Sequence, residues 1–109
     1  GQVCVAPTRF LVQERVYEPF LERVVAAAKA RKVGPGMDPE STMGAMANAR
    51  RIQAMEGMVA DAVQRGATVE TGGRRIGNKG YFFEPTVLTG VSREAHAMNE
   101  EPFGPMALV

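Results

Sequence analysis

One stretch in the middle of the chain decides the fold: residues 47–71 read ANARRIQAMEGMVADAVQRGATVET. Apolar residues recur there every three or four positions, which predicts a helix over about residues 47–65. Its apolar face consists of Ile52, Met55, Met58, Val59, Ala62 and Val63. Gly66 is typical of the left-handed residue that ends a helix, and the alternation over residues 67–71 predicts a short strand. A helix that leads directly into a strand favours an α/β fold.

The segments before this stretch predict a strand and another helix. Residues 10–12 form a short apolar run, which is typical of a buried strand. Apolar residues then recur at helical spacing from about residue 16 to residue 32, and Pro19 fits that helix only in its first turn, where a missing N–H has no partner to lose. Gly34-Pro35-Gly36 ends the helix. Four methionines at helical spacing are interpreted as core packing rather than as a binding surface: Met43, Met46, Met55 and Met58.

The residues after this stretch predict further strands. Gly72-Gly73 indicates a turn, and the extended run over residues 84–88 contains Pro85, which favours a sheet edge or a bulge. A loop or short helix is expected over residues 92–99, and residues 106–109 begin another buried strand. The whole pattern predicts an α/β fold, with an incomplete, mostly parallel sheet flanked by two main helices.

Composition places the chain among ordinary globular proteins, because 45% of its 109 residues are apolar and 23% are charged. A formal net charge of +1 gives no broad basic field, so we expect no nucleic-acid partner. The pairs Arg50-Arg51 and Arg74-Arg75 are interpreted as solvated surface charge. The longest apolar run, residues 24–28, is far too short to cross a bilayer, and no leader opens the chain. We therefore expect no membrane partner and a soluble, cytoplasmic protein.

Cys4 is the only cysteine, and it lies close behind a glycine. A thiol is a nucleophile only as the thiolate, at a site that an electrophile can reach, and Gly1 permits a close approach because it has no Cβ. The other interpretation is a small, inert core residue, which is common for a free cysteine. One cysteine and one histidine, His96, can form neither a disulfide nor a Cys/His metal site. We predict no metal and a reducing compartment.

Two segments carry a resemblance to a known family. Residues 1–6, Gly-Gln-Val-Cys-Val-Ala, together with residues 8–13, resemble the active-site cysteine segment of the aldehyde dehydrogenase superfamily. Residues 99–105, Asn-Glu-Glu-Pro-Phe-Gly-Pro, resemble the cofactor-contacting Glu-x-Phe-Gly-Pro motif of that family. The resemblance continues between the two motifs and covers essentially the whole chain, although Gly44-Ala45 stands where the family commonly has Gly-Pro.

The resemblance implies an NAD(P)-dependent oxidation of an aldehyde to a carboxylate. Cys4 would form a thiohemiacetal and then a thioester, and its backbone N–H would be one donor to the oxyanion. Glu101 would accept hydrogen bonds from the nicotinamide ribose, and Phe103 would help to hold the ribose and the ring. His96 is interpreted as a loop or helix residue rather than as the base, because the base of the family is a glutamate. The cofactor would be NAD or NADP, and the complete enzyme would be a homo-oligomer.

The boundaries suggest a piece of a larger enzyme. Residues 1–109 are interpreted as a partial catalytic domain, with the cofactor-binding and oligomerisation segments and the glutamate base expected outside it, so the chain alone should be inactive. The run over residues 81–86 resembles semialdehyde-oxidising members most. Two alternatives stay open: a coenzyme-A-acylating semialdehyde dehydrogenase, and a non-catalytic relic that binds a partner.

Overall fold

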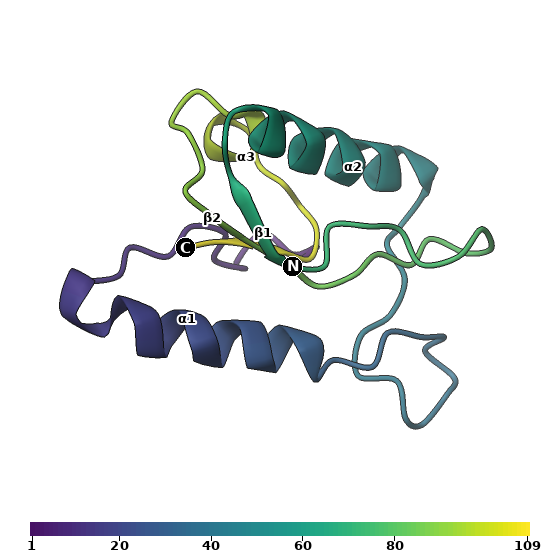
Figure 1. Ribbon diagram of the computed structural model, residues 1–109. Coiled ribbons are helices and arrows are strands. Elements are labelled where there is room, and N and C mark those ends of the chain that lie inside the picture. Colours follow the sequence, from purple (N-terminus) through teal and green to yellow (C-terminus); the bar gives the residue numbers. More distant parts are fainter.

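The computed structural model describes the whole chain, residues 1–109. Three helices and three strands follow one another in the order α1, α2, β1, β2, α3, β3. Their bounds are Glu14–Lys29 for α1, Ala49–Gln64 for α2, Thr68–Thr71 for β1, Thr86–Thr89 for β2, His96–Asn99 for α3 and Met106–Leu108 for β3. Helices α1 and α2 cover opposite faces of the small sheet (Figure 1). The predicted α/β fold with two main helices is confirmed.

The sheet has the strand order β1-β2-β3. Strands β1 and β2 are antiparallel, with a register irregularity between Val69 and Thr71, and β2 and β3 are parallel. Arg9 forms a parallel bridge with Leu108, so the segment that follows the cysteine lies along β3. The sheet is therefore mixed, and its parallel side carries the beginning of the chain.

Helix α2 provides one wall of the main core. Its buried residues are Ile52, Met55, Met58, Val59 and Ala62. They pack in one cluster with Phe83, Leu88, Met106 and Leu108. The predicted face is confirmed except for Val63, which is 47% exposed because it lies at the margin of the apolar stripe in the last turn. The predicted cap is also confirmed, since Gly66 has a φ of +96°.

Helix α1 is amphipathic but contains no buried residue. It begins at Glu14, two residues before the predicted start, so Pro19 lies inside the helix and the prediction of a first-turn proline was wrong. Because proline has no N–H, Pro19 cannot donate to the carbonyl of Arg15, four residues earlier. Pro19 and Arg15 are both exposed. Water can therefore satisfy that carbonyl, which explains why the helix tolerates the proline.

Two strand predictions need correction. Residues 10–12 do not form a buried strand, because the chain leaves the sheet after Phe10 N–H donates to Leu108 O at 2.8 Å, and Leu11 is 99% exposed. Of the two alternatives for Pro85, the sheet edge is wrong, because Pro85 precedes β2, which is the central strand and is wholly buried. The ladder between β1 and β2 has a register irregularity, but it lies between Val69 and Thr71 and not at Pro85. Proline is tolerated there since it lies before the first ladder position. The predicted short helix over residues 92–99 and final strand over residues 106–109 are confirmed as α3 and β3.

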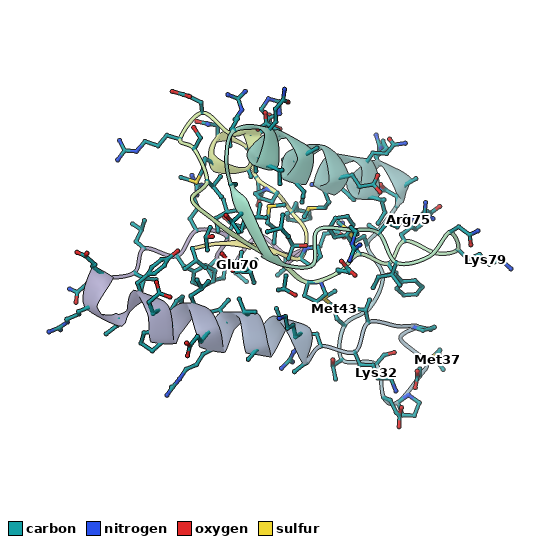
Figure 2. The ribbon with its side chains drawn as sticks, in the orientation of Figure 1. Lys32, Met37, Met43, Glu70, Arg75 and Lys79 are labelled. Carbon is teal, nitrogen blue, oxygen red and sulfur yellow. The ribbon has the colours of Figure 1, made fainter.

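Two loops extend beyond one end of the sheet, with Met37 and Lys79 at their outer ends (Figure 2). An ion pair between Lys32 and Glu40 braces the first loop. In the second loop Arg75 donates to two backbone carbonyls, those of Asn78 at 3.1 Å and Gly80 at 2.9 Å. No helix of the chain has the length and apolar character that a membrane crossing requires.

Candidate active site

Cys4 lies in a tight turn that the Ala6 N–H closes on the Val3 carbonyl at 3.0 Å. The thiol is free and exposed, so the alternative of a buried core cysteine was wrong. The Cys4 backbone N–H donates to no acceptor within the chain. A free thiol and an available N–H donor therefore occur on the same exposed residue, which is the pairing that nucleophilic attack on a carbonyl requires.

The cysteine segment packs directly on the Glu-Pro-Phe-Gly-Pro segment through two glycines. A Cβ placed on Gly1 would lie 1.9 Å from the carbonyl oxygen of Gly104 and 3.2 Å from the Cα of Pro105. Only glycine fits such an approach between two backbones. Because three peptide units separate Cys4 from Gly1, Cys4 lies within about 11 Å of this contact. The fold thus brings together the two segments that the sequence singled out.

The second segment presents an acidic and an aromatic side chain on a constrained turn. Glu101 is exposed, and its carboxylate makes no hydrogen bond or ion pair within the chain. Pro102 is fully buried and anchors the turn. Phe103 is half-buried and has a φ of +45°, the one positive φ outside glycine in this chain. A left-handed phenylalanine persists only where its surroundings fix it, which is typical of a binding site.

The first two turns of α2, together with Ala47 just before them, hold both segments in place. The Gln2 Oε1 atom accepts the N–H of Ala47 at 3.0 Å, one residue before the helix cap Asn48. Arg51 donates from Nη2 to the carbonyl of Pro102. Gly104 lies against Met55, since a Cβ there would be 2.4 Å from the Met55 Sδ atom. The helix that forms the core therefore also sets the relative position of Cys4 and Phe103.

Sequence reasoning missed the part that Arg51 plays. The interpretation of Arg50-Arg51 as solvated surface charge holds for the exposed Arg50 and is wrong for the half-buried Arg51. Arg51 precedes Met55 by four residues and Met58 by seven, so it belongs to the core-facing stripe of α2. That spacing was the available signal. The prediction that the methionines pack in the core is confirmed for Met46, Met55 and Met58.

His96 is engaged at the start of α3, as the helix prediction implied. Its backbone N–H donates to Asp61 Oδ2 at 2.8 Å, and its Nδ1 lies 3.6 Å from Glu100 Oε1. The hydrogen bond from the Arg65 side chain lowers the pKa of Asp61, and the backbone N–H of His96 lowers it further. The side-chain neighbours of the His96 ring are two carboxylates, Asp61 on α2 and Glu100 after α3. No group of three or more His, Cys, Asp or Glu side chains is arranged to hold a metal ion.

Comparison with known proteins gives one family over the full length. The model of the aldehyde dehydrogenase family matches residues 1–109. A mitochondrial aldehyde dehydrogenase of Leishmania tarentolae is 44% identical over 109 residues, which are 100% of this chain and 22% of the relative. A probable NADP(+) succinate-semialdehyde dehydrogenase of Sinorhizobium fredii is 45% identical over 107 residues, or 98% of this chain and 22% of the relative.

Solved structures give the same result. The NAD+ complex of an aldehyde dehydrogenase from Bacillus cereus superposes with a TM-score of 0.95 at 36% identity, over 100% of this chain and 22% of that one. A succinate-semialdehyde dehydrogenase from Burkholderia pseudomallei gives a TM-score of 0.94 at 44% identity, over 99% of this chain and 22% of that one. The chain thus spans about a fifth of the length of these relatives. From its first residue to its last, the chain belongs to the aldehyde dehydrogenase family.

Proposed function

We propose that this chain supplies the nucleophile and part of the nicotinamide site of an NAD(P)-dependent dehydrogenase that oxidises an aldehyde to a carboxylate. One observation carries the proposal: the contact between Gly1 and Gly104 brings the segment of Cys4 against the segment of Glu101 and Phe103. In this proposal residues 1–109 are part of a catalytic domain. The remaining cofactor-binding and oligomerisation segments belong to a longer polypeptide, and the complete enzyme is a homo-oligomer.

The residues on the second segment fit a nicotinamide nucleotide. The carboxylate of Glu101 has two acceptor oxygens without partners in the chain, which suits two ribose hydroxyls. Phe103, two residues further along the chain, offers an aromatic ring on a turn with a left-handed φ of +45°. The Sinorhizobium relative is named for NADP(+), and the Bacillus structure is an NAD+ complex, so we propose NAD or NADP. When bound, the nicotinamide accepts a hydride.

The Cys4 residue carries the covalent chemistry. Its thiolate attacks the aldehyde carbon, a C–S bond forms, and the carbonyl oxygen becomes an oxyanion. The free backbone N–H of Cys4 can donate a hydrogen bond to that oxyanion. Departure of a hydride from that carbon leaves a thioester on the sulfur. Water then breaks the C–S bond, which yields the carboxylate and returns the thiol. Covalent capture divides one difficult oxidation into two easier steps.

The substrate we propose is a small semialdehyde. The relatives from Sinorhizobium fredii and Mus musculus are named succinate-semialdehyde dehydrogenases, and residues 81–86 favour the same group. The mouse relative is named mitochondrial. A cytoplasmic location for this chain stays a prediction.

The test is Cys4→Ser in the full polypeptide, with succinate semialdehyde and with NAD+ or NADP+. We expect turnover to fall by at least about a thousandfold because the nucleophile is lost. Binding of NAD+ or NADP+ should be retained. Normal turnover in this variant would contradict the proposal. Product analysis with added coenzyme A separates a carboxylate from an acyl-coenzyme A, and an unmodified polypeptide with an inert Cys4 thiol and no turnover would favour the non-catalytic relic.

A further inference from the structure

Arg51 is the one charged side chain that reaches from α2 to the turn of Phe103. Its Nη2 donates to the carbonyl of Pro102, a residue 51 positions further along the chain. The guanidinium is packed against protein, because its Nε is buried and has no hydrogen-bond partner. Its backbone is fixed as well, since the Arg51 N–H donates to the cap residue Asn48 at Oδ1, 3.2 Å away. A rigid donor therefore holds one carbonyl.

That carbonyl controls the conformation of Phe103. The carbonyl of Pro102 and the nitrogen of Phe103 belong to one planar peptide unit. A hydrogen bond to the carbonyl oxygen therefore fixes the orientation of this peptide plane, and φ of Phe103 is the rotation of the following backbone relative to that plane. On the far side, the Gly104 carbonyl accepts the N–H of Met106 at 2.8 Å and lies against Gly1. Phe103 is thus held from both sides in the left-handed region, which a residue with a Cβ adopts only under constraint.

We infer that Arg51 is a positioning residue for the nicotinamide site. Arg51 acts through the Pro102 carbonyl to hold the two neighbours of Pro102, Glu101 and Phe103, ready for the cofactor. This assignment rests on the proposed function, because it gives Arg51 a role in binding NAD or NADP. It makes no demand on Cys4, whose segment is held by a separate contact, between Gln2 and Ala47, which precedes the cap of α2. Loss of Arg51 should therefore affect cofactor binding and spare the reactivity of the thiol.

Arg50 provides a matched control, since it is the preceding residue on the same helix, is exposed, and makes no side-chain hydrogen bond or ion pair. The experiment compares Arg51→Met, which keeps an unbranched stem and removes the donors, with Arg50→Met in the full polypeptide. Amide hydrogen exchange of the peptide over residues 99–106 is measured without cofactor. Titration calorimetry gives the affinity for NAD+ and NADP+, and iodoacetamide gives the alkylation rate of Cys4.

For Arg51→Met we expect amide exchange over residues 99–106 to accelerate about tenfold, and the cofactor Kd to rise about tenfold, as expected for the loss of one hydrogen bond from a charged donor. Alkylation of Cys4 should stay within about twofold of its normal rate, because its anchor is intact. Arg50→Met should change none of the three. Arg51→Lys, which keeps one cationic donor without the planar fork, should give intermediate values.

The inference is overturned if Arg51→Met matches Arg50→Met in exchange and affinity. It is also overturned if exchange across α2 and alkylation of Cys4 rise together with the Kd, because that result indicates a general loss of structure. Should Arg51→Met not fold, Arg51→Lys decides, and unchanged exchange and affinity there refute the role. If the unmodified polypeptide binds neither NAD+ nor NADP+, the proposed function fails, whereas the exchange measurement still decides whether Arg51 holds the turn.

Discussion

The contact between Gly1 and Gly104 makes a sharp prediction about activity. In Gly1→Ala the new Cβ would lie 1.9 Å from the carbonyl oxygen of Gly104, whereas real Cβ contacts are essentially never shorter than 3.0 Å. The opposing atom is backbone, so no side-chain rotation can relieve the overlap. The two segments must move apart.

The size of the effect follows from that distance. The segments must separate by at least about 1.1 Å to reach the shortest separation that Cβ atoms show, and a misplacement of about 1 Å costs about a hundredfold in rate. Cys4 is carried by one segment and Phe103 by the other, so the whole displacement falls between nucleophile and cofactor site. We expect kcat/KM to fall about a hundredfold, or about 2.7 kcal/mol of transition-state stabilisation.

The assay is steady-state oxidation of succinate semialdehyde by the full polypeptide, with thermal unfolding measured on the same samples. Gly44→Ala is the control, because a Cβ at Gly44 has nothing within 4 Å and its φ is not positive. The control should retain normal turnover. A folded Gly1→Ala variant that keeps kcat/KM within about threefold of normal would falsify the claim that this contact sets the geometry of the site.

Three further predictions concern stability. Gly104→Ala should destabilise the fold by about 1–3 kcal/mol, since its Cβ would lie 2.4 Å from the Sδ of the buried Met55. Gly57→Ala should stabilise the fold by about 0.5–1 kcal/mol, because Gly57 lies in mid-helix and its Cβ would have nothing within 4 Å. Equal urea midpoints for the two variants would contradict this reasoning. The pKa of Asp61 is lowered in the folded state, first by the Arg65 hydrogen bond, so its charge stabilises the fold above the ordinary value of 3.8 and that contribution is lost as the pH falls through the lower folded pKa. The difference in Tm between the unmodified protein and Asp61→Asn should shrink as the pH falls below about 4. A difference unchanged at about pH 2 would refute the role of the charge.

Local patterns in the sequence were sufficient for much of the fold. The apolar stripe of α2, the left-handed Gly66 and the final strand each depend on neighbours a few residues away, so periodicity and turn chemistry predicted them. Two errors arose where distant residues decide. Leu11 is exposed because the chain leaves β3 after one bridge, and the apolar run over residues 10–12 holds no sign of that departure. Pro85 lies just before a central strand, which only the pairing of β2 on both sides reveals.

In the candidate site, too, some residues could be identified from the sequence, whereas the contacts between distant residues could not. Cys4, Glu101 and Phe103 were found by resemblance, and their roles in catalysis and cofactor binding stay predictions. The contact of Gly1 with Gly104 joins opposite ends of the chain, and a glycine has no side chain to indicate its neighbour. Arg51 could have been placed by helical spacing, but which carbonyl it would meet depends on the path of the turn at Pro102.

The two halves of α2 make different contacts, and this has a practical consequence for protein engineering. Around Arg51 and Met55, the helix touches the turn of the proposed site, so repacking there to gain thermostability would trade against turnover. Around Met58 and Ala62, the same helix packs in the core alone, one to two turns further from that turn. A directed-evolution library meant to raise the Tm of the full polypeptide should draw its α2 positions from this second half. Under the proposed function, a library meant to change cofactor preference should draw them from the first half.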